Sequence, residues 1–266
     1  MRIVLLLFAT GALCAQTLKT HENLNATLWS QSAAEYRGAT QTIFRGAKLA
    51  LDLALRNKKW TAVSQTGKYQ KLKPAIVSDI DETLLDNSPF QARMVDRGIN
   101  WDPKSWTEWV NEGKAEPIPG ALEFLRYAAS RGVTVFYVTN RRHAEEEAAT
   151  KKNLQKFDFP WRDDMDVLLT AGENGWTSDK QARREHVAKS FRVVMLMGDD
   201  FNDFVPAYVA LEKRAELEKL GAANWGSTWF LIPNPTYGSW EAALYGFDRT
   251  LSREQVLGRK YESLRK

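Results

Sequence analysis

The sequence predicts an α/β fold with a parallel, doubly wound sheet of the Rossmann-like type. Short apolar runs alternate along the chain with longer segments of helical character. Strands of parallel sheets are buried on both faces, so they appear as near-continuous hydrophobic runs. Alternation of such strands with helices implies right-handed crossovers that place helices on both faces of the sheet. The runs lie at residues 75–77, 133–138, 167–169, 192–197 and 228–232.

The composition is ordinary for a soluble globular protein. Of the 266 residues, 44% are apolar and 26% are charged. The formal net charge of +4 mildly favours anionic substrates, and no basic block is interleaved with aromatic residues. We therefore predict a small-molecule ligand and no nucleic-acid polymer as partner. Beyond the N-terminal segment, no stretch is apolar for long enough to span a membrane.

Residues 1–15 are predicted to be a secretory signal peptide. Arg2 supplies a charged start, and an apolar stretch and small residues follow it. We expect an exported protein, either periplasmic or associated with the outer membrane or cell surface. Cys14 is the only cysteine, so the mature chain has no disulfide. Two outcomes stay open for Cys14, a lipid anchor or ordinary cleavage nearby, because Leu13 and Gly11 depart from the usual lipidation pattern.

The chain is expected to divide into four parts. Residues 1–15 are the signal peptide. Residues 16–73 form an N-terminal helical segment packed on the core, because apolar residues recur there at helical spacing. Residues 74–250 form the core, with a small helical insertion at about 87–118 after the first strand. Residues 251–266 form a basic C-terminal helix.

Between the strands of the core, helical spacing and charge patterns predict three further helices. Two of them carry charge runs that are typical of a solvated helix face. These helices cover residues 121–130, 143–156 and 206–220, and residues 234–241 are expected to form a loop.

Three tryptophans lie in the predicted insertion. Trp106 and Trp109 are three residues apart, so they can share one face of a helix, where core packing is expected. Trp101 precedes Asp102 and Pro103 in a predicted loop, which makes it the better candidate for contact with a ligand.

Two aspartates follow the first strand directly. Asp79 and Asp81 lie where open α/β sheets hold their ligands, at the carboxyl end of a parallel strand. Two carboxylates so close repel each other unless a cation intervenes, and hard oxygen ligands suit Mg²⁺. A plain turn rich in Asp and Asn is the alternative. A calcium loop is excluded, because Leu84 and Phe90 replace the required Gly and Glu.

Polar residues also follow the other strands. Carboxyl ends of parallel strands meet at one edge of a sheet, so these residues are expected to converge with Asp79 and Asp81. Such a set suits phosphoryl transfer through a carboxylate: one carboxylate attacks, a second moves a proton, and cations offset the phosphate charge. The residues are Thr139 and Asn140 after the second strand, Lys180 after the third, and Asp199 and Asp203 after the fourth.

The strand-end motifs resemble those of the haloacid dehalogenase (HAD) superfamily. Asp79-x-Asp81-Glu-Thr, with Leu85-Asp-Asn-Ser88 after it, looks like the first motif. The chain also contains segments that look like the second, third and fourth motifs of this superfamily. In that order they are Val138-Thr139-Asn140-Arg141, Lys180 and Gly198-Asp199-Asp200-x-x-Asp203-Phe204. The combination is most similar to the class C (DDDD-type) bacterial acid phosphatases, which include outer-membrane lipoprotein phosphatases and 5′-nucleotidases. The resemblance implies a HAD-like sheet and a phosphoric monoester hydrolase.

The resemblance also implies a role for each strand-end residue. Asp79 is expected to be the nucleophile and, through one oxygen, a ligand of Mg²⁺. Asp81 is expected to be the general acid and base, with its backbone carbonyl on the metal. Lys180 is expected to neutralise the phosphate and the nucleophile. Asp199 and Asp203 are expected to bind Mg²⁺, and Thr139 and Asn140 to bind the phosphoryl oxygens. Asp200 is expected to have a structural role.

Two aromatic residues match places where this family surrounds the leaving group with rings. They are Trp101 and Tyr237. Stacking on a flat ring tolerates different bases, so the implied substrates are nucleoside 5′-monophosphates, nicotinamide mononucleotide or aryl phosphates. A phosphotransferase of the same fold and a non-catalytic surface binding protein stay as alternatives, and a homodimer is left open.

Overall fold

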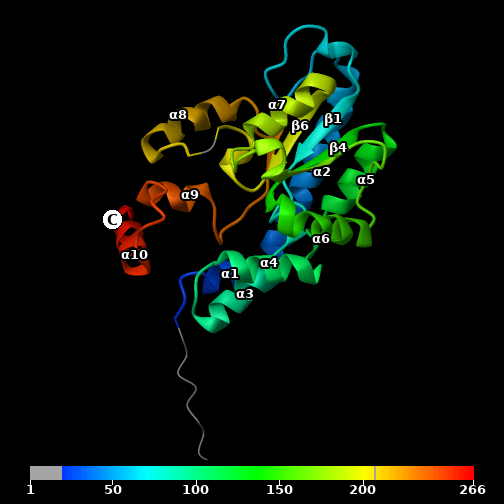
Figure 1. Ribbon diagram of the computed structural model, residues 1–266. Coiled ribbons are helices and arrows are strands. Elements are labelled where there is room, and N and C mark those ends of the chain that lie inside the picture. The colour runs from blue at the N-terminus through cyan, green and yellow to red at the C-terminus, as the bar shows by residue number, and fades with distance from the viewer. Residues whose placement is uncertain (1–19, 207) are drawn as a thin grey trace, which may run out of the picture.

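A computed structural model of the chain describes residues 20–206 and 208–266 (Figure 1). The predicted signal peptide and Cys14 lie outside the described residues. A five-stranded parallel sheet of order β5-β4-β1-β6-β7 forms the centre, which confirms the predicted fold class. Its strands are β1 (Pro74–Ser78), β4 (Thr134–Arg142), β5 (Leu168–Ala171), β6 (Arg192–Gly198) and β7 (Trp229–Leu231).

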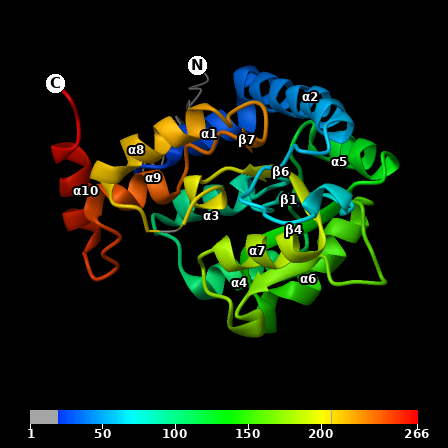
Figure 2. The ribbon, with the colours of Figure 1, turned by 90° about the horizontal axis from the view of Figure 1, so that it is seen from above.

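Helices cover both faces of this sheet. Helices α2 and α5 lie on one face, and α6 and α7 lie on the other (Figure 2). All seven residues of β6 are buried as a result, which explains its uninterrupted apolar run. The α-helices are α1 (Leu24–Ser32), α2 (Ala34–Arg56), α3 (Ser88–Arg97), α4 (Pro103–Glu112), α5 (Ala121–Ser130), α6 (His143–Lys156), α7 (Gln181–Ser190), α8 (Leu211–Ala222), α9 (Ser239–Ala242) and α10 (Arg253–Glu262). Short 3₁₀ turns lie at Tyr69–Lys71, Glu173–Gly175, Phe201–Asp203 and Ala243–Tyr245.

The residues after β1 form a small substructure of α3, α4 and two short antiparallel strands, β2 (Leu85–Asp86) and β3 (Glu116–Pro117). Local sequence explains the ends of both helices. Gly98 has a positive φ of 67° and ends α3. The side chain of Asp102 accepts a hydrogen bond from the Ser105 amide at 2.9 Å and caps α4, with Pro103 as the first helical residue. This substructure occupies the predicted insertion, and the division of the chain into domains stays a prediction.

Helix α7 was not expected from the sequence. It packs through two buried arginines, Arg183 and Arg184, and one apolar residue, Val187, so its sequence lacks an apolar stripe. The short helix α9 begins inside the segment 234–241, where a loop was expected, and α8 starts at Leu211 rather than at residue 206.

Helices α8, α9 and α10 lie together on one side of the sheet in both views (Figures 1 and 2). Helix α1, near the N-terminus, packs against α3 of the insertion. Among the described helices, none has the length and apolar character needed to cross a membrane.

Candidate active site

A cavity of about 600 Å³ opens at the carboxyl edge of the sheet. The last residues of β4 and the residues that follow β1 and β6 line its inner end, as the topology of a parallel sheet predicts. Of the predicted site residues, the lining includes Asp79, Asp81, Asn140, Lys180, Asp199, Asp200, Asp203, Trp101 and Tyr237.

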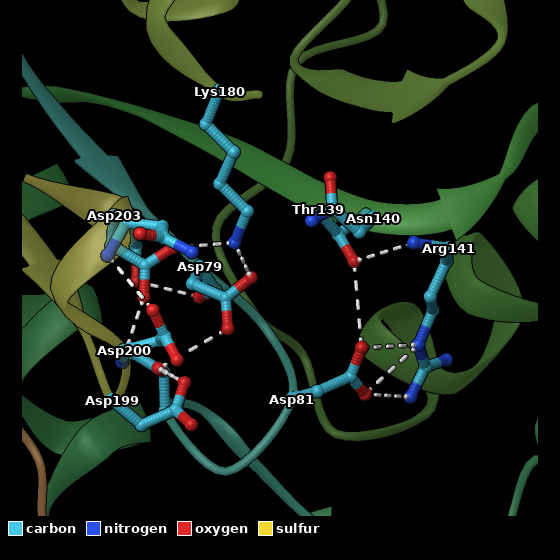
Figure 3. A network of polar contacts seen from close by, with 12 residues as sticks. Asp79, Asp81, Thr139, Asn140, Arg141, Lys180, Asp199, Asp200 and Asp203 are labelled. Carbon is cyan, nitrogen blue, oxygen red and sulfur yellow. Dashed lines mark hydrogen bonds and ion pairs between the residues drawn. The ribbon is translucent and has the colours of Figure 1, made fainter. Parts of the chain in front are cut away.

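Lys180 occupies the centre of the inner end (Figure 3). Its Nζ donates to Asp203 Oδ1 at 2.6 Å and also to Asp79 Oδ1. Burial alone would lower the pKa of Lys180, but the charges of Asp203 and Asp79 outweigh it and raise this pKa above the usual value. Lys180 is therefore a permanent cation that joins carboxylates from two different strands.

Three carboxylates gather around this lysine. Oxygen atoms of Asp79, Asp199 and Asp203 all lie within 4.8 Å of one another. Burial and the charge of Asp79 raise the pKa of Asp199 well above its usual value, and burial also raises the pKa of Asp203. One lysine does not balance three carboxylates, so a divalent cation would relieve the remaining repulsion. The donor set consists only of hard oxygen atoms and fits such a cation.

Two neutral residues hold Asp199, and neither was predicted from the sequence. Asn234 Nδ2 donates to Asp199 Oδ2 at 2.8 Å. Thr83 Oγ1 lies 3.1 Å from Asp199 Oδ1 and 3.3 Å from Asp79 Oδ2. Thr83 belongs to the first motif, which was the available signal, whereas Asn234 lies in a segment that was expected to be only a loop.

The turn after β6 fixes Asp203. The backbone amide of Asp200 donates to Asp203 Oδ2 at 3.0 Å, and the Asp200 carboxylate accepts from the Asn202 amide at 2.8 Å. The first of these bonds is one half of a capping box, whose other half joins the backbone amide of Asp203 to the Asp200 side chain. A Cβ atom at Gly198 would collide with the Asp203 side chain, so this close approach requires glycine.

Asp81 turns away from Asp79 (Figure 3). Arg141 donates to Asp81 Oδ1 from Nη2 at 2.7 Å and from Nε at 3.0 Å. The Arg141 side chain is 1% exposed and that of Asp81 is 16% exposed, so the arginine is buried while the carboxylate reaches the cavity. Each aspartate of the first motif thus has its own cation, Lys180 for Asp79 and Arg141 for Asp81. Arg141 belongs to the segment that resembles the second motif, but no role was predicted for it from the sequence.

The two predicted phosphate ligands lie differently. Asn140 lines the cavity, and its Oδ1 accepts from Arg183 Nη2 at 2.7 Å, which fixes the orientation of the amide. Thr139 is completely buried and does not line the cavity. Its hydroxyl lies 3.4 Å from Asp81 Oδ2 and accepts from the Arg141 amide at 3.1 Å. The Thr139 hydroxyl therefore lies beside Asp81, and the expected contact of Thr139 with a phosphoryl oxygen stays a prediction.

The two predicted aromatic residues both line the cavity. Trp101 is 58% exposed and leaves much of its ring accessible. The Tyr237 hydroxyl donates to the buried Glu82. Burial and the charge of Glu82 raise the pKa of Tyr237 well above its usual value, so the hydroxyl stays protonated.

The outer end of the cavity combines segments that are far apart in the sequence. His21 Nε2 donates to the Ile99 carbonyl at 3.1 Å, since a carbonyl can only accept. Lys260 of α10 pairs with Glu22 at 2.6 Å and also with Glu241. All five residues line the cavity.

The fold and the site together define a Rossmann-like α/β protein of the phosphoryl-transfer class. Carboxylates from several strand ends converge on a buried lysine in a cavity at the carboxyl edge of the sheet.

Comparison with known proteins identifies the family. Residues 7–240 match the family model of the HAD superfamily, subfamily IIIB (acid phosphatase), and the chain belongs to this family. The structure is similar to that of the class C acid phosphatase from Bacillus anthracis, which is 32% identical in sequence. That match covers 92% of this chain and 97% of the other, with a TM-score of 0.80. A second structure of the same protein, with tungstate bound, matches with a TM-score of 0.82.

More distant relatives share part of the chain. The class B acid phosphatase of Morganella morganii is 28% identical over 142 residues, and a stem 28 kDa glycoprotein of Glycine max is 25% identical over 168 residues. These matches cover 50% and 62% of this chain. The chain spans 60% of the length of each of these two relatives. The predicted family is confirmed.

Proposed function

We propose that the protein is an exported, Mg²⁺-dependent acid phosphatase that hydrolyses phosphomonoesters through an aspartyl-phosphate on Asp79. The observation that carries this proposal is the bond from Lys180 to both Asp79 and Asp203 at the centre of the carboxylate cluster. Such an arrangement holds an anionic nucleophile beside the positive charge that an approaching phosphate requires. The family supports the same chemistry. Tungstate, bound in one of the similar structures from Bacillus anthracis, is a tetrahedral oxyanion like phosphate.

The reaction has two steps in this proposal. An oxygen of Asp79 attacks phosphorus, the bond from phosphorus to the ester oxygen breaks, and Asp81 gives its proton to the departing alcohol. Asp81 then takes a proton from water, whose oxygen attacks the phosphorus of the aspartyl-phosphate. Phosphate leaves, and the Asp79 carboxylate is restored. Lys180 and the Asn140 amide hold the phosphoryl oxygens in both steps.

The carboxylates of Asp79, Asp199 and Asp203 would hold the Mg²⁺ ion, together with the backbone carbonyl of Asp81. A bound divalent cation offsets the charge of the phosphate and allows the anionic nucleophile to approach it. Thr83 and Asn234 keep Asp199 in position through their contacts with its two oxygens.

The substrate proposed is an ester with a flat leaving group. The cavity of about 600 Å³ is much larger than a phosphate needs, and Trp101 and Tyr237 line it. Both rings offer a surface on which a base or an aryl group can stack. Nucleoside 5′-monophosphates, nicotinamide mononucleotide and aryl phosphates satisfy this description. Export, by lipid anchoring at Cys14 or as a soluble periplasmic protein, belongs to the same proposal.

The replacement Asp79→Asn tests the proposed function. We expect the variant to fold, with the circular dichroism spectrum of the native chain, and to lose about 10³-fold or more of its activity on p-nitrophenyl phosphate. Chelation should abolish activity in the native protein, and added Mg²⁺ should restore it. Asp163→Asn, at an exposed position, is the matched control and should leave activity unchanged. Activity retained in Asp79→Asn would exclude the proposed nucleophile.

A further inference from the structure

A buried asparagine contacts the proposed proton carrier. Asn87 is 0% exposed, and its Nδ2 donates to Asp81 Oδ1 at 2.9 Å. The other end of the same amide, Oδ1, accepts from Trp109 Nε1 at 2.8 Å. Trp109 lies in α4 and is 2% exposed. A chain of two hydrogen bonds therefore connects the helical insertion to Asp81.

The direction of this chain is fixed by chemistry. An indole N–H can only donate, so Asn87 must turn its carbonyl oxygen towards Trp109. The amide nitrogen then faces Asp81, where a carboxylate accepts. A flipped amide would place its N–H group against the indole N–H and its oxygen against the Asp81 carboxylate, and both contacts are repulsive. Trp109 thus determines which group Asn87 presents to Asp81.

Two further residues of the insertion pack around Trp109 and link its helices. The guanidinium of Arg93, in α3, lies 4.9 Å from the centre of the Trp109 ring. Arg93 forms two hydrogen bonds to Glu112 of α4, at 2.6 and 2.8 Å. Helices α3 and α4 are therefore joined around the indole that orients Asn87.

We propose that Asn87 and Trp109 are positioning residues for Asp81, so that the insertion controls the proton-transfer step of the reaction. This inference rests on the proposed function of Asp81. Arg141 contacts both oxygens of Asp81 from β4. Asn87 approaches the same carboxylate from the insertion and limits its rotation. A general acid works only within hydrogen-bond reach of the leaving oxygen, so a loosened Asp81 loses proton transfer before it loses phosphate binding.

Trp109→Phe tests this inference, because phenylalanine retains a buried ring but lacks the N–H. Two substrates are compared with Mg²⁺ present: p-nitrophenyl phosphate, whose phenolate leaves without a proton, and an alkyl phosphate, whose alkoxide needs one. For the alkyl ester we expect kcat/KM to fall about 10- to 100-fold, part of the usual contribution of a general acid. For p-nitrophenyl phosphate the fall should stay within about threefold, and competitive inhibition by inorganic phosphate should not change.

Trp229→Phe is the matched control. Trp229 is also a buried tryptophan, and its indole donates to the Ala62 carbonyl at 3.0 Å, away from the cavity. Any change in kcat/KM that Trp229→Phe causes should be equal for both esters. Asn87→Ser is the second variant, because serine retains an N-cap residue for α3 but cannot span the two partners. Trp109→Phe combined with Asn87→Ser should be no worse on the alkyl ester than either alone, because both act through one chain of bonds.

Each other outcome overturns the inference. Equal losses on both esters in Trp109→Phe, or weaker inhibition by phosphate, would assign Trp109 a merely structural role. Unchanged kinetics in both variants would show that Arg141 alone positions Asp81. If the native protein hydrolyses neither ester, the proposed function fails and this inference fails with it. If the native protein hydrolyses both esters but Trp109→Phe does not distinguish between them, this inference fails while the proposed function stands.

Discussion

The two ends of the cavity are held together by different kinds of interaction. At the inner end, Asp79, Lys180 and Asp203 are each less than 10% exposed and bonded within a buried cluster attached to the sheet. At the outer end, Lys260 and Glu22 form a partly exposed ion pair between distant segments. Helix α10, which carries Lys260, has no buried residue. The inner end is therefore rigid and suited to chemistry, whereas the outer end can change at little energetic cost and is suited to the choice of substrate.

Of the replacements at the two ends of the cavity, that of Lys180 should have the largest effect on activity and on the free energy of unfolding. In Lys180→Met the carboxylates of Asp79 and Asp203 lose their buried partner. We expect activity to fall about 10³-fold or more. The free energy of unfolding should fall by about 3 to 5 kcal/mol, as for other broken buried ion pairs. Urea unfolding in the presence of a chelator, together with hydrolysis of p-nitrophenyl phosphate, measures both quantities. Lys189→Met, at an exposed position of the same helix α7, should leave both nearly unchanged, and a loss of activity below tenfold in Lys180→Met would contradict the assigned role.

A methyl group added at Gly198 should also disturb the inner end of the cavity, but with a smaller loss of stability than Lys180→Met. The added Cβ would collide with Asp203, so the carboxylate must move away from Lys180. We expect Gly198→Ala to lower the free energy of unfolding by about 1 to 3 kcal/mol, as for other overpacked sites, and to weaken metal binding. Calorimetric titration with Mg²⁺ and urea unfolding measure these changes. Gly38→Ala, in helix α2 with open space around it, should instead stabilise the protein by about 0.5 to 1 kcal/mol. Equal Mg²⁺ affinity in Gly198→Ala and the native protein would show that Asp203 tolerates the displacement.

The carboxylates of the inner end could be predicted from the sequence because they follow the strands closely, whereas Lys180 lies in a loop well beyond β5. Asp79, Asp199 and Asp203 lie at most five residues beyond a buried apolar run, and the parallel sheet brings such positions together. Thr139 differs, because it lies inside β4, is completely buried and has its hydroxyl beside Asp81. The position along the chain therefore predicts which edge of the sheet a residue occupies, and the side-chain direction needs the structure.

The outer end could not be predicted in this way. Its contacts join residues that no periodic pattern relates, such as His21 with Ile99 and Glu22 with Lys260. Trp101 was selected from its place in a predicted loop and from the family resemblance, not from any contact that the sequence reveals. The buried arginines of α7 were missed for a related reason: Arg183 bonds to the carbonyl of Thr139 and to Asn140, and a charged residue in a helix normally indicates a solvated face. Hydrogen bonds between polar groups that are far apart in the sequence do not produce a hydrophobic periodicity, so the sequence pattern does not predict them.

Replacement of Lys260 should have the smallest effect and should act only on the choice of substrate. Lys260→Met removes two partly exposed ion pairs of α10, to Glu22 and Glu241, which together contribute about 1 kcal/mol. The proposed function places the base of a nucleoside 5′-monophosphate towards the outer end, so for this substrate we expect a decrease of about two- to fivefold in kcat/KM. The smaller ester phenyl phosphate would not extend that far under the same proposal and should be hydrolysed as by the native protein.

The ion pairs of Lys260 can be tested further by salt dependence and by a control variant in the same helix. Partly exposed ion pairs are screened by salt, so the difference between the native protein and Lys260→Met should shrink at high ionic strength. Arg259→Met is the matched control, because Arg259 lies in the same helix and pairs with Glu262 on the surface. It should leave both substrates unaffected. If Lys260→Met instead reduced hydrolysis of phenyl phosphate as much as that of the nucleotide, the outer end would be coupled to the chemistry, and the two ends of the cavity would have to be treated as one unit.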